Sequence, residues 1–507
     1  MHLNNKMNTL FSSFFSTVKH MFYSAVLLVF LACNSTKSKT AEKLNTEELE
    51  NRPNVILIMA DDMGWGDTGY NGHNHIKTPY LDDMAANGMQ FSRFYAAGPV
   101  CSPTRGSVLT GRNPNRYGIT NANAGHLKKE EVTLAEVFKA NGYATGHFGK
   151  WHLGTLFPDY SAKGHKRKAS ENYMTPKMAD FDTYFSSEFS IATYDPFIRD
   201  KEHAHAKDWL EKGDRRALYV NNDKPVQEDL EGCDSEIIMN RVLPFIKENA
   251  KDKRPFFTVV WFHAPHEPVV GHPKYMKTLY SDLEKNKQHY YSVITVLDAQ
   301  IGLLRAALKV MGIADNTLVC FTSDNGPEGN PGTMSRRQGS TKGLRGRKRS
   351  LYEGGIRVPG VIEWPSKIVP GSRNNMPVVS SDYFPTFCDV LGYDVTDDRP
   401  YDGISLIPTL KGKGKERNKN IGFWYQSHKQ QALIGDRYKL VHNIGANRAK
   451  SDNSKQERKA YELYDIIKDP EEKNNIISAN KKLAEKMKIE LTQFVKSCEQ
   501  SSLGTDY

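Results

Sequence analysis

Pairs of side chains with metal-binding oxygens follow directly after apolar runs of the sequence. One pair is Asp61 with Asp62, and another is Asp324 with Asn325. Carboxylate and amide oxygens are the ligands that hard cations such as Ca²⁺ and Mg²⁺ prefer, whereas a typical zinc site uses nitrogen and sulfur. Carboxylates gathered in one place would repel one another without such an ion. The residue types therefore predict a divalent-cation site wherever the two runs lie side by side.

Lysine and histidine side chains follow two further apolar runs. Lys150 and His152 come after one of them, and His263 and His266 come after the other. Histidine is the usual carrier of protons near neutral pH, and lysine attracts anions. For any one polar residue in such a place, a capping or turn role is the commoner explanation. Their recurrence at the ends of several runs instead favours one shared site.

Cys101 stands at the start of a predicted short helix. Ser102 is predicted to cap that helix, Pro103 suits its first turn, and Gly111 ends it. Arg105 lies in the first turn, and a helix N-terminus beside an arginine is a site for an anion. The cysteine is therefore half of a disulfide, a nucleophile, or a residue that does not remain a thiol.

These residues need a scaffold that brings them together, and the hydrophobic pattern predicts one. Apolar runs at 54–60, 143–148, 256–262 and 317–323 are typical of parallel strands buried on both faces. Helical patterns lie between them at 81–88, 133–141 and 290–311. The alternation predicts an α/β fold, in which ligands bind at the carboxyl ends of the strands.

The last part of the chain has a different pattern. A helix at 382–391 still belongs to the main domain, and a basic connector follows at 411–419. Short strands at 421–425, 431–434 and 438–442, a turn region at 462–465 and a helix at 479–498 come next. We expect a catalytic domain at 53–412 and a small antiparallel-sheet subdomain at 413–507.

The N-terminal segment resembles an export signal. Its apolar run is too short to span a bilayer and ends at Ala32 and Cys33, which resemble a bacterial lipobox. Phe30 departs from that pattern and leaves plain secretion open. We expect a signal peptide at 1–33, a flexible tether at 34–52, and a protein in the periplasm, or anchored by lipid to the outer membrane, of a Gram-negative bacterium. A retained membrane-anchored N-terminus is the alternative.

The cysteines form no recognisable metal or redox motif. Six occur, at positions 33, 101, 233, 320, 388 and 498, and no two form a Cys-x-x-Cys pair. With Cys33 given to lipid, an odd number is left, so at least one is unpaired if the others bridge. Cys320 and Cys388 lie in apolar runs, where cysteine is usually a small buried hydrophobic residue.

The charge balance favours an anionic partner. Among 507 residues, lysine and arginine number 69 against 59 for aspartate and glutamate. A sulfate- or phosphate-bearing substrate, anionic lipid or nucleic acid would suit that excess, but export and the lack of a binding motif disfavour nucleic acid. Basic residues gather at Lys166–Lys168 and at Arg336, Arg337, Lys342, Arg345, Arg347, Lys348 and Arg349. Such clusters indicate either a solvated face or a groove for a polyanionic chain.

Several ordered blocks of sequence resemble one family of enzymes. They are Cys101-Ser-Pro-Thr-Arg105 with Thr110-Gly-Arg112, DDMGWGD at 61–67, GKWHLG at 149–154 and YEGGIRVPG at 352–360. On these blocks, residues 54–359 are similar to the type I sulfatases of the alkaline phosphatase superfamily, such as arylsulfatases and N-acetylgalactosamine-6-sulfatases. The resemblance implies an alkaline-phosphatase-like fold, with a large, mostly parallel mixed sheet flanked by helices and a C-terminal subdomain made of an antiparallel sheet and a helix.

The resemblance also implies what happens to Cys101. In this family a formylglycine-generating enzyme or an anaerobic sulfatase-maturating enzyme oxidises the cysteine to formylglycine (3-oxoalanine), and the aldehyde is hydrated to a geminal diol. A sulfated alcohol cannot easily release sulfate without a second attack at sulfur. A sulfated diol releases it by breaking a C–O bond, because the second hydroxyl re-forms the aldehyde.

The resemblance assigns site roles residue by residue. The ligands of Ca²⁺, with Mg²⁺ as the alternative, are Asp61, Asp62, Asp324, Asn325 and an oxygen of the modified Cys101. The ion would polarise the sulfate and lower the pKa of the diol. Arg105 would hold the diol, Lys150 would steady the nucleophile, and His152 would deprotonate its second hydroxyl.

The same resemblance places His263 and Lys348 where they would grip the ester and protonate the leaving alkoxide. Arg349 stands where many relatives carry glycine. His73, His75 and His266 are either substrate contacts or loop residues, and Trp65 either shapes the pocket or packs in the core.

The function expected from these features is that of an exported carbohydrate sulfatase. Its substrate would be a sulfated polysaccharide or its oligosaccharides, with ulvan or carrageenan favoured over glycosaminoglycan. One alternative is a formylglycine-dependent phosphodiesterase or phosphonate monoester hydrolase. Another is a non-catalytic, glycan-binding surface lipoprotein.

Overall fold

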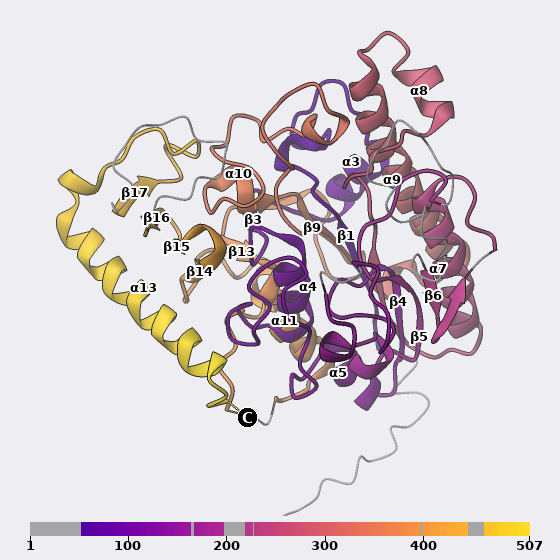
Figure 1. Ribbon diagram of the computed structural model, residues 1–507, viewed down its shortest axis with the longest axis horizontal. Coiled ribbons are helices and arrows are strands. Elements are labelled where there is room, and N and C mark those ends of the chain that lie inside the picture. Colours follow the sequence, from indigo (N-terminus) through magenta and orange to yellow (C-terminus); the bar gives the residue numbers. More distant parts are fainter. Residues whose placement is uncertain are drawn as a thin grey trace, which may run out of the picture. The chain divides into compact units, whose positions relative to one another are not determined.

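A computed structural model shows how the chain is arranged (Figure 1). It describes residues 52–163, 167–196, 219–226, 228–395, 398–444 and 461–506. The predicted signal peptide, the tether up to residue 51, and Lys166 of the basic cluster lie outside the described residues. None of the helices in the described part of the chain is long and apolar enough to cross a membrane.

A ten-stranded mixed sheet forms the centre of the molecule, with strands in the order β12-β2-β11-β9-β1-β8-β4-β5-β6-β7. Its five middle strands are mutually parallel: β9 (Thr317–Ser323), β1 (Asn54–Ala60), β8 (Phe256–Trp261), β4 (Ala144–Lys150) and β5 (Thr183–Ser187). The strands β1, β4, β8 and β9 are buried along their whole length, as their apolar sequences predict. The predicted α/β fold class is confirmed.

Short strands extend the sheet at both edges. They are β2 (Met89–Phe91), β11 (Gly360–Glu363) and β12 (Ser372–Asn374) on one side, and β6 (Tyr219–Asn221) and β7 (Lys224–Val226) on the other. The contacts of β11 with β9 and β2, and those of β6 with β5 and β7, are antiparallel. A separate three-stranded sheet consists of β10 (Arg357–Val358), β3 (Phe94–Tyr95) and β13 (Val378–Val379).

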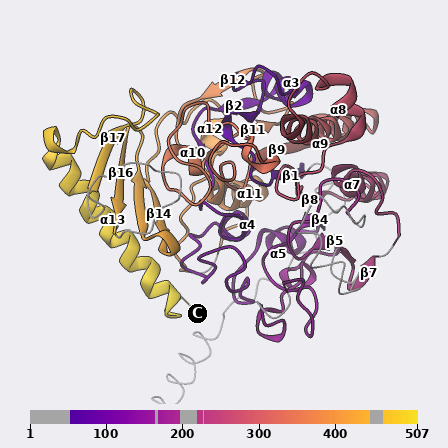
Figure 2. The ribbon, with the colours of Figure 1, turned by 45° about the horizontal axis from the view of Figure 1, so that its top comes forward.

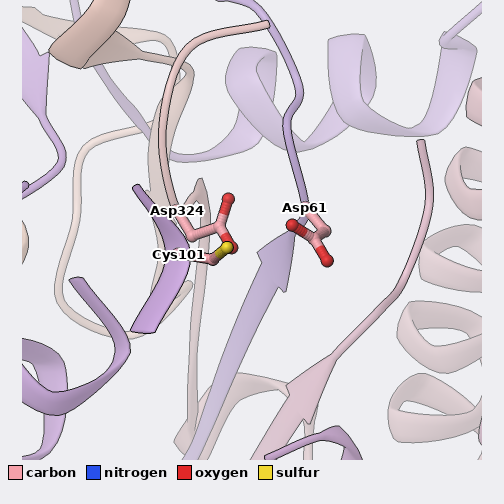
Figure 3. Close-up of side chains that lie close together, drawn as sticks. All are labelled: Asp61, Cys101 and Asp324. Carbon is pink, nitrogen blue, oxygen red and sulfur yellow. The ribbon is translucent and has the colours of Figure 1, made fainter. Parts of the chain in front are cut away.

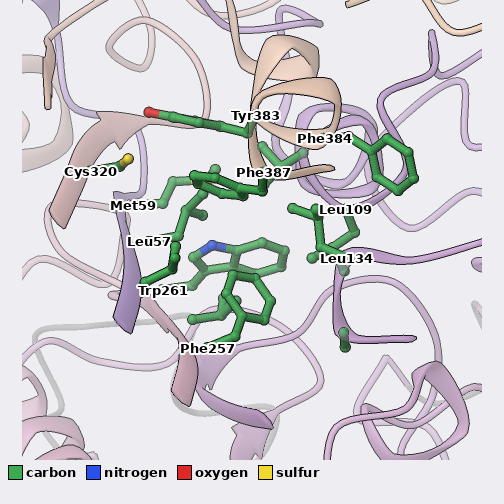
Figure 4. Packing of buried hydrophobic residues seen from close by; sticks show 14 of the residues in the cluster. Leu57, Met59, Leu109, Leu134, Phe257, Trp261, Cys320, Tyr383, Phe384 and Phe387 are labelled. Carbon is green, nitrogen blue, oxygen red and sulfur yellow. The ribbon is translucent and has the colours of Figure 1, made fainter. Parts of the chain in front are cut away.

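Helices cover both faces of the large sheet. One face packs against α4 (Cys101–Thr110), α5 (Leu134–Ala140) and α11 (Tyr383–Leu391), and the other against α3 (Pro79–Asn87), α7 (Asp234–Lys251) and α9 (Lys285–Val310). Alternate residues of β1 point to opposite faces, so Leu57 joins the first core and Ile58 the second. Figure 4 shows the first core, where Phe387 of α11 lies over Leu57 and Trp261.

A four-stranded antiparallel sheet follows near the C-terminus (Figure 2). Its strands are β14 (Ile421–Tyr425), β15 (Gln430–Ile434), β16 (Tyr438–Asn443) and β17 (Tyr461–Asp465), and α13 (Lys481–Ser502) packs along it. The other α-helices in the described part of the chain are α8 (Pro273–Leu279), α10 (Glu353–Ile356) and α12 (Ile407–Leu410). The predicted C-terminal antiparallel sheet and helix are confirmed.

Three local predictions need correction. Residues 462–465, predicted as a turn region, lie in β17, because the segment pairs along its length with β16. Ser102 does not cap α4, since the helix already begins at Cys101 and its N-cap residue is Val100. The strand predicted at 143–148 continues as β4 to Lys150.

A buried ion network joins the C-terminal sheet to the main domain. Lys439 of β16 lies 2.9 Å from both Glu353 of α10 and Glu472, and all three side chains are buried. Burial raises the pKa of Glu472 to about 7, since Lys439 offsets only part of the effect and Glu353 adds to it. Burial would also raise the pKa of Glu353, but Lys439 and Arg357 outweigh it and lower that pKa. Lys439, with help from Arg357 at Glu353, thus compensates for a pair of buried acids.

Lys439→Met is expected to lower the free energy of unfolding by about 3–5 kcal/mol, because two buried carboxyls lose their cation. Without Lys439 the pKa of both carboxyls is expected to rise, that of Glu472 further above the ordinary 4.5 than that of Glu353, since Arg357 still opposes the effect of burial at Glu353. The free energy of unfolding of the variant therefore falls as pH rises past 4.5, and the stability lost through the substitution is larger at pH 8 than at pH 5. Urea unfolding at several pH values measures it.

Lys168→Met is the matched control for this variant. Lys168 forms an ion pair with Glu171 in which both side chains are largely exposed. Its loss is expected to leave the unfolding curve unchanged. Equal unfolding curves for Lys439→Met and the unmodified protein would show that the network does not stabilise the fold.

Candidate active site

Parallel pairing of β1 with β9 brings the predicted metal ligands together. The register pairs Ala60 with Ser323, so the residues that follow these strands meet at one edge of the sheet. The backbone N–H of Asp62 donates to Asp324 Oδ1 over 3.1 Å, and Asn325 Nδ2 donates to Asp62 Oδ1 over 2.7 Å. All of these side chains are buried. The structure therefore brings together Asp61, Asp62, Asp324 and Asn325.

Cys101 completes this cluster from the other side. It is the first residue of α4, a helix whose residues are all buried and whose C-cap is Gly111 with a φ of 71°. Figure 3 shows its side chain beside Asp324 and facing Asp61. The ligand atoms of these three residues lie within 4.8 Å of one another. Helix α4 therefore presents the cysteine, with its own positive N-terminus, to the carboxylates.

Buried cations surround the carboxylates. Lys150 Nζ lies 2.5 Å from Asp61 Oδ2, and a guanidinium nitrogen of Arg105 lies 2.6 Å from Asp324 Oδ2 and 3.7 Å from Asp61 Oδ2. Lys348 Nζ donates to both oxygens of Asp62 over 2.6 and 2.7 Å. Three residues predicted to hold the nucleophile or the ester thus contact the predicted metal ligands.

The site has the donors and the charge that suit a divalent cation. Asp61 Oδ1 and Asn325 Oδ1 are buried and accept no hydrogen bond, which is costly unless another donor or an ion is present. Asp61, Asp62 and His266 also have ligand atoms within 4.8 Å of one another. An ion held here would satisfy the free oxygens and reduce the repulsion between the carboxylates.

The pKa values of the two facing carboxyls move in opposite directions. Burial would raise the pKa of Asp61, but Lys150, His266 and Arg105 outweigh it and hold that pKa well below its ordinary value. Burial, followed by repulsion from Asp61, raises the pKa of Asp324 to about 7. The protein's own cations therefore compensate fully for only one of the two charges.

The thiol of Cys101 is in a poor environment for a thiolate. Burial raises its pKa, and the charges of Lys150 and Lys348 offset only part of that rise. A neutral thiol is a weak nucleophile and a weak metal ligand at neutral pH. In the described part of the chain every cysteine is free and buried, so Cys101 forms no disulfide there.

His152 is placed to accept a proton. Its Nε2 lies 3.0 Å from the amide oxygen of Asn123, so Nε2–H donates and Nδ1 is left as the acceptor; Nδ1 is buried and makes no hydrogen bond. Burial, with the charges of Lys150 and Arg105, lowers the pKa well below its ordinary value and keeps the imidazole neutral. His152 has a φ of 59° and Asp62 one of 66°, the left-handed backbone that non-glycine residues adopt rarely and often at functional sites.

The structure places His266, and not His263, on the wall of the cavity at the site. His263 is fully buried, with Nδ1 2.9 Å from Asp234 and Nε2 2.6 Å from Ser187 Oγ, and it does not line the cavity at the site. His266 does line that cavity. Its Nδ1–H donates to the carbonyl of Glu267, and its Nε2 lies 3.7 Å from Asp62. The position expected for His263 is therefore held by His266.

A cavity of about 710 Å³ opens above Cys101. Its lining includes the predicted residues Cys101, His152 and Lys348. Besides His266, other polar residues on its wall are Asn121, Asn123, Lys163, Ser190, Glu267, Glu328, Asn330, Arg336, Arg337, Arg347 and Arg349. The space is large enough for a small organic ester to reach the cysteine.

The predicted basic cluster is divided by the fold. Arg336, Arg337, Arg347 and Arg349 line the cavity with Lys348. Lys342 instead donates to the backbone carbonyl of Gly72, and Arg345 bonds to Tyr464. Neither lines the cavity, so the cluster is only partly a ligand surface.

The remaining candidates lie outside the cavity wall. His73 Nδ1 accepts hydrogen bonds from the backbone N–H groups of His75 and Ile76, as in a turn, and the ring of Trp65 stacks under Arg357 at 4.9 Å. Sequence reasoning missed Asn123, Ser190 and Glu328. Ser190 donates to Asp61 over 3.2 Å, but a lone serine or asparagine in a loop carries no signal of such a role.

Comparison with known proteins agrees with these observations. A family model described as Sulfatase matches residues 53–393, and one described as N-sulphoglucosamine sulphohydrolase, C-terminal, matches residues 346–497. The N-acetylgalactosamine-6-sulfatase of Mus musculus is 32% identical over 76% of this chain and 71% of its own length. Arylsulfatase A of Homo sapiens is 31% identical over 84% of this chain and 83% of its own.

A similar solved structure is the protein designated Ps i-CgsB. It matches with a TM-score of 0.74 and 27% identity, covering 89% of this chain and 94% of its own. That protein has also been solved in complex with k-i-k-neocarrahexaose.

Removal of divalent ions with EDTA is expected to lower the melting temperature of the protein, because Asp61, Asp62 and Asp324 then repel one another in a buried site. An ion at roughly 100 to 1,000 times its Kd would stabilise the folded state by about 3–4 kcal/mol. Thermal unfolding in EDTA, followed by titration with Ca²⁺ or Mg²⁺, measures the shift.

Asp324→Asn, which removes one carboxylate of the cluster, is expected to weaken the response to the ion. Asp315→Asn alters an exposed acid elsewhere and should respond like the unmodified protein. A melting temperature that is the same in EDTA and in Ca²⁺ or Mg²⁺ would contradict the assignment of a cation site.

Proposed function

The chain belongs to the sulfatase family of sulfuric ester hydrolases, and on that premise we propose that it removes sulfate esters from a sulfated polysaccharide or its oligosaccharides. The observation that carries this proposal is the cavity of about 710 Å³ that joins Cys101 to a wall of lysine and arginine side chains. Ps i-CgsB, which has a similar fold, binds a carrageenan oligosaccharide. A carrageenan-type chain is therefore the first substrate to test, with ulvan and glycosaminoglycan after it.

We also propose that the protein is exported and that Cys101 acts only after oxidation. The lipobox-like ending at Cys33 supports transfer to the periplasm, with a lipid anchor in the outer membrane as one outcome. The position of Cys101 in a Cys-x-Pro-x-Arg block supports conversion to 3-oxoalanine by a formylglycine-generating or anaerobic sulfatase-maturating enzyme. The buried, neutral thiol is consistent with a residue whose sulfur is not the reacting atom.

The residues that would hold the ion are Asp61, Asp62, Asp324 and Asn325, with Ca²⁺ preferred and Mg²⁺ as the alternative. When bound, the divalent ion supplies positive charge that polarises the sulfate ester and favours deprotonation of the nucleophile. Arg105 and Lys150 fix the carboxylates that face Cys101, through contacts of 2.6 and 2.5 Å. They keep the ligand oxygens in one geometry and compensate for part of their charge.

The other side chains of the site handle the substrate and its protons. His152 Nδ1 would be the proton acceptor, since Nε2–H is held by Asn123 and Nδ1 makes no hydrogen bond. Burial would lower the pKa of Lys348, but Asp62 outweighs it and raises that pKa above its ordinary value, so the ammonium stays charged beside the sulfate oxygens. His266 lines the cavity, and its imidazolium form, which carries a proton on Nε2 as well as on Nδ1, would give the Nε2 proton to the departing alkoxide.

The matured protein is expected to release sulfate from at least one member of a panel of carrageenan, ulvan and glycosaminoglycan oligosaccharides. NMR of the product locates the lost sulfate, and mass spectrometry of the peptide around Cys101 reports its conversion. Cys101→Ala should lower turnover about 10⁴-fold or more, because the nucleophile is absent. Cys388→Ala, which alters another buried cysteine, is the matched control and should stay active.

Two results would count against this function. Hydrolysis of an aryl phosphodiester without hydrolysis of any sulfate ester would indicate the phosphodiesterase or phosphonate hydrolase alternative. Complete retention of the Cys101 thiol after expression with the maturation enzyme, together with oligosaccharide binding, would indicate a non-catalytic glycan-binding protein.

His266→Ala is expected to lower kcat/KM about 10²- to 10⁴-fold with little change in melting temperature, because its ring lines the cavity. His263→Ala is expected to act mainly on stability, by about 1–3 kcal/mol, since Asp234 and Ser187 lose a buried partner. Steady-state kinetics on an aryl sulfate and thermal unfolding of both variants separate these effects. An inactive but fully stable His263→Ala would restore the proton-transfer role to His263.

A further inference from the structure

Most of the cations on the cavity wall are already engaged by the protein itself. Lys348 pairs with Asp62, and Arg349 lies 2.6 Å from Glu328. Burial would raise the pKa of Glu328, but Lys348 and Arg349 lower it to about 2, so this acid stays charged between them. These pairs neutralise much of the positive wall and leave less charge for a ligand.

Arg336 and Arg347 are engaged as well. Arg336 forms an ion pair with Glu267, and Arg347 donates to the backbone carbonyls of Glu328 and Gly339. Arg337 differs from both. Its guanidinium forms no ion pair or hydrogen bond with any residue in the described part of the chain, whereas a buried Nε without an acceptor is common to all three arginines.

Arg337 is nevertheless held in place by its own loop. Its side chain lies against Gly329 and Gly332, where an added Cβ would come within 3.2 Å of its Nε and 3.5 Å of its Cδ, respectively. Gly329 has a φ of 56°, which suits glycine. The stem therefore lies close to the loop backbone, which reduces the side-chain freedom to be lost when the guanidinium binds a ligand.

We propose that Arg337 binds a second anionic group of the saccharide whose sulfate ester lies at Cys101. The inference rests on the proposed function for the position of that first sulfate. A guanidinium that has no partner among the described residues and lies on the wall of a cavity can recognise a planar or tetrahedral oxyanion through paired N–H donors. The group is a sulfate ester or a uronate carboxylate, so the preferred substrate carries at least two negative charges near the cleaved bond.

Kinetics with substrates of matched size test this proposal. Arg337→Gln is expected to lower kcat/KM about 10- to 100-fold for an oligosaccharide with a second sulfate or carboxylate, mainly through KM. For an oligosaccharide with one sulfate, and for an aryl sulfate, the loss should be at least about tenfold smaller. Arg337→Lys should recover part of the loss. Comparing sulfated and uronate-bearing substrates identifies which anion is bound.

Lys342→Gln is the matched control, since Lys342 is an exposed cation of the same segment that lies outside the cavity. It should leave every kinetic constant unchanged. An equal loss in Arg337→Gln for singly and doubly charged substrates, or no loss for either, would overturn the proposal.

Measuring oligosaccharide binding to catalytically inactive protein tests the anion site independently of the proposed function. In a Cys101→Ala background, calorimetry with the doubly charged oligosaccharide should show a Kd that rises about 10- to 100-fold when Arg337→Gln is added. An unchanged Kd overturns the second-anion site. If the active protein hydrolyses no sulfated saccharide, the proposed function fails, whereas a Kd that still depends on Arg337 supports the anion site by itself.

Discussion

The parallel pairing of β1 with β9 is the constraint on which the rest of the site depends. It places Asp61, Asp62 and Asp324 at one buried edge of the sheet, where three like charges cannot be kept without compensation. Lys150 and Arg105 provide part of that compensation, and the oxygens left free provide the place for a divalent ion. In the proposed function, the cost of gathering these charges is tolerated because the same arrangement would bind and polarise an anionic ester.

The packing below this edge keeps the charged groups in position. The guanidinium carbon of Arg105 lies 5.1 Å from the centre of the Trp261 ring, at the end of β8, in a cation–π contact. Gly149 lets β4 approach β8 closely, since a Cβ there would lie 2.0 Å from the carbonyl oxygen of Trp261. Lys150 therefore leaves β4 directly beside Asp61. The apolar core shown in Figure 4 thus also supports the charged groups at the edge of the sheet.

Much of this arrangement was predictable because strong local patterns determine it. The apolar runs that became β1 and β9 have the bounds predicted for them, and oxygen-bearing residues at the ends of neighbouring parallel strands must meet. The orientation of His263 and His266 was not predictable, since they lie in a loop after β8 where no period fixes which ring faces the cavity. Residues 461–465 lacked a strand signal of their own and became β17 through pairing with β16. The split of the basic cluster likewise depends on long-range contacts, such as that of Arg345 with Tyr464.

The C-terminal sheet supports the candidate active site by contacting the loop that carries Lys348 and Arg349. Tyr352 donates to Glu462 of β17, and the backbone N–H of Leu351 donates to the side chain of Gln430 in β15. These contacts fix the end of the loop that carries Lys348 and Arg349, while Lys439 holds α10 directly after it. A cation that must meet Asp62 over 2.6 Å tolerates little freedom in its loop. The C-terminal sheet therefore fixes the position of Lys348, the cation that contacts Asp62 at the edge of the large sheet.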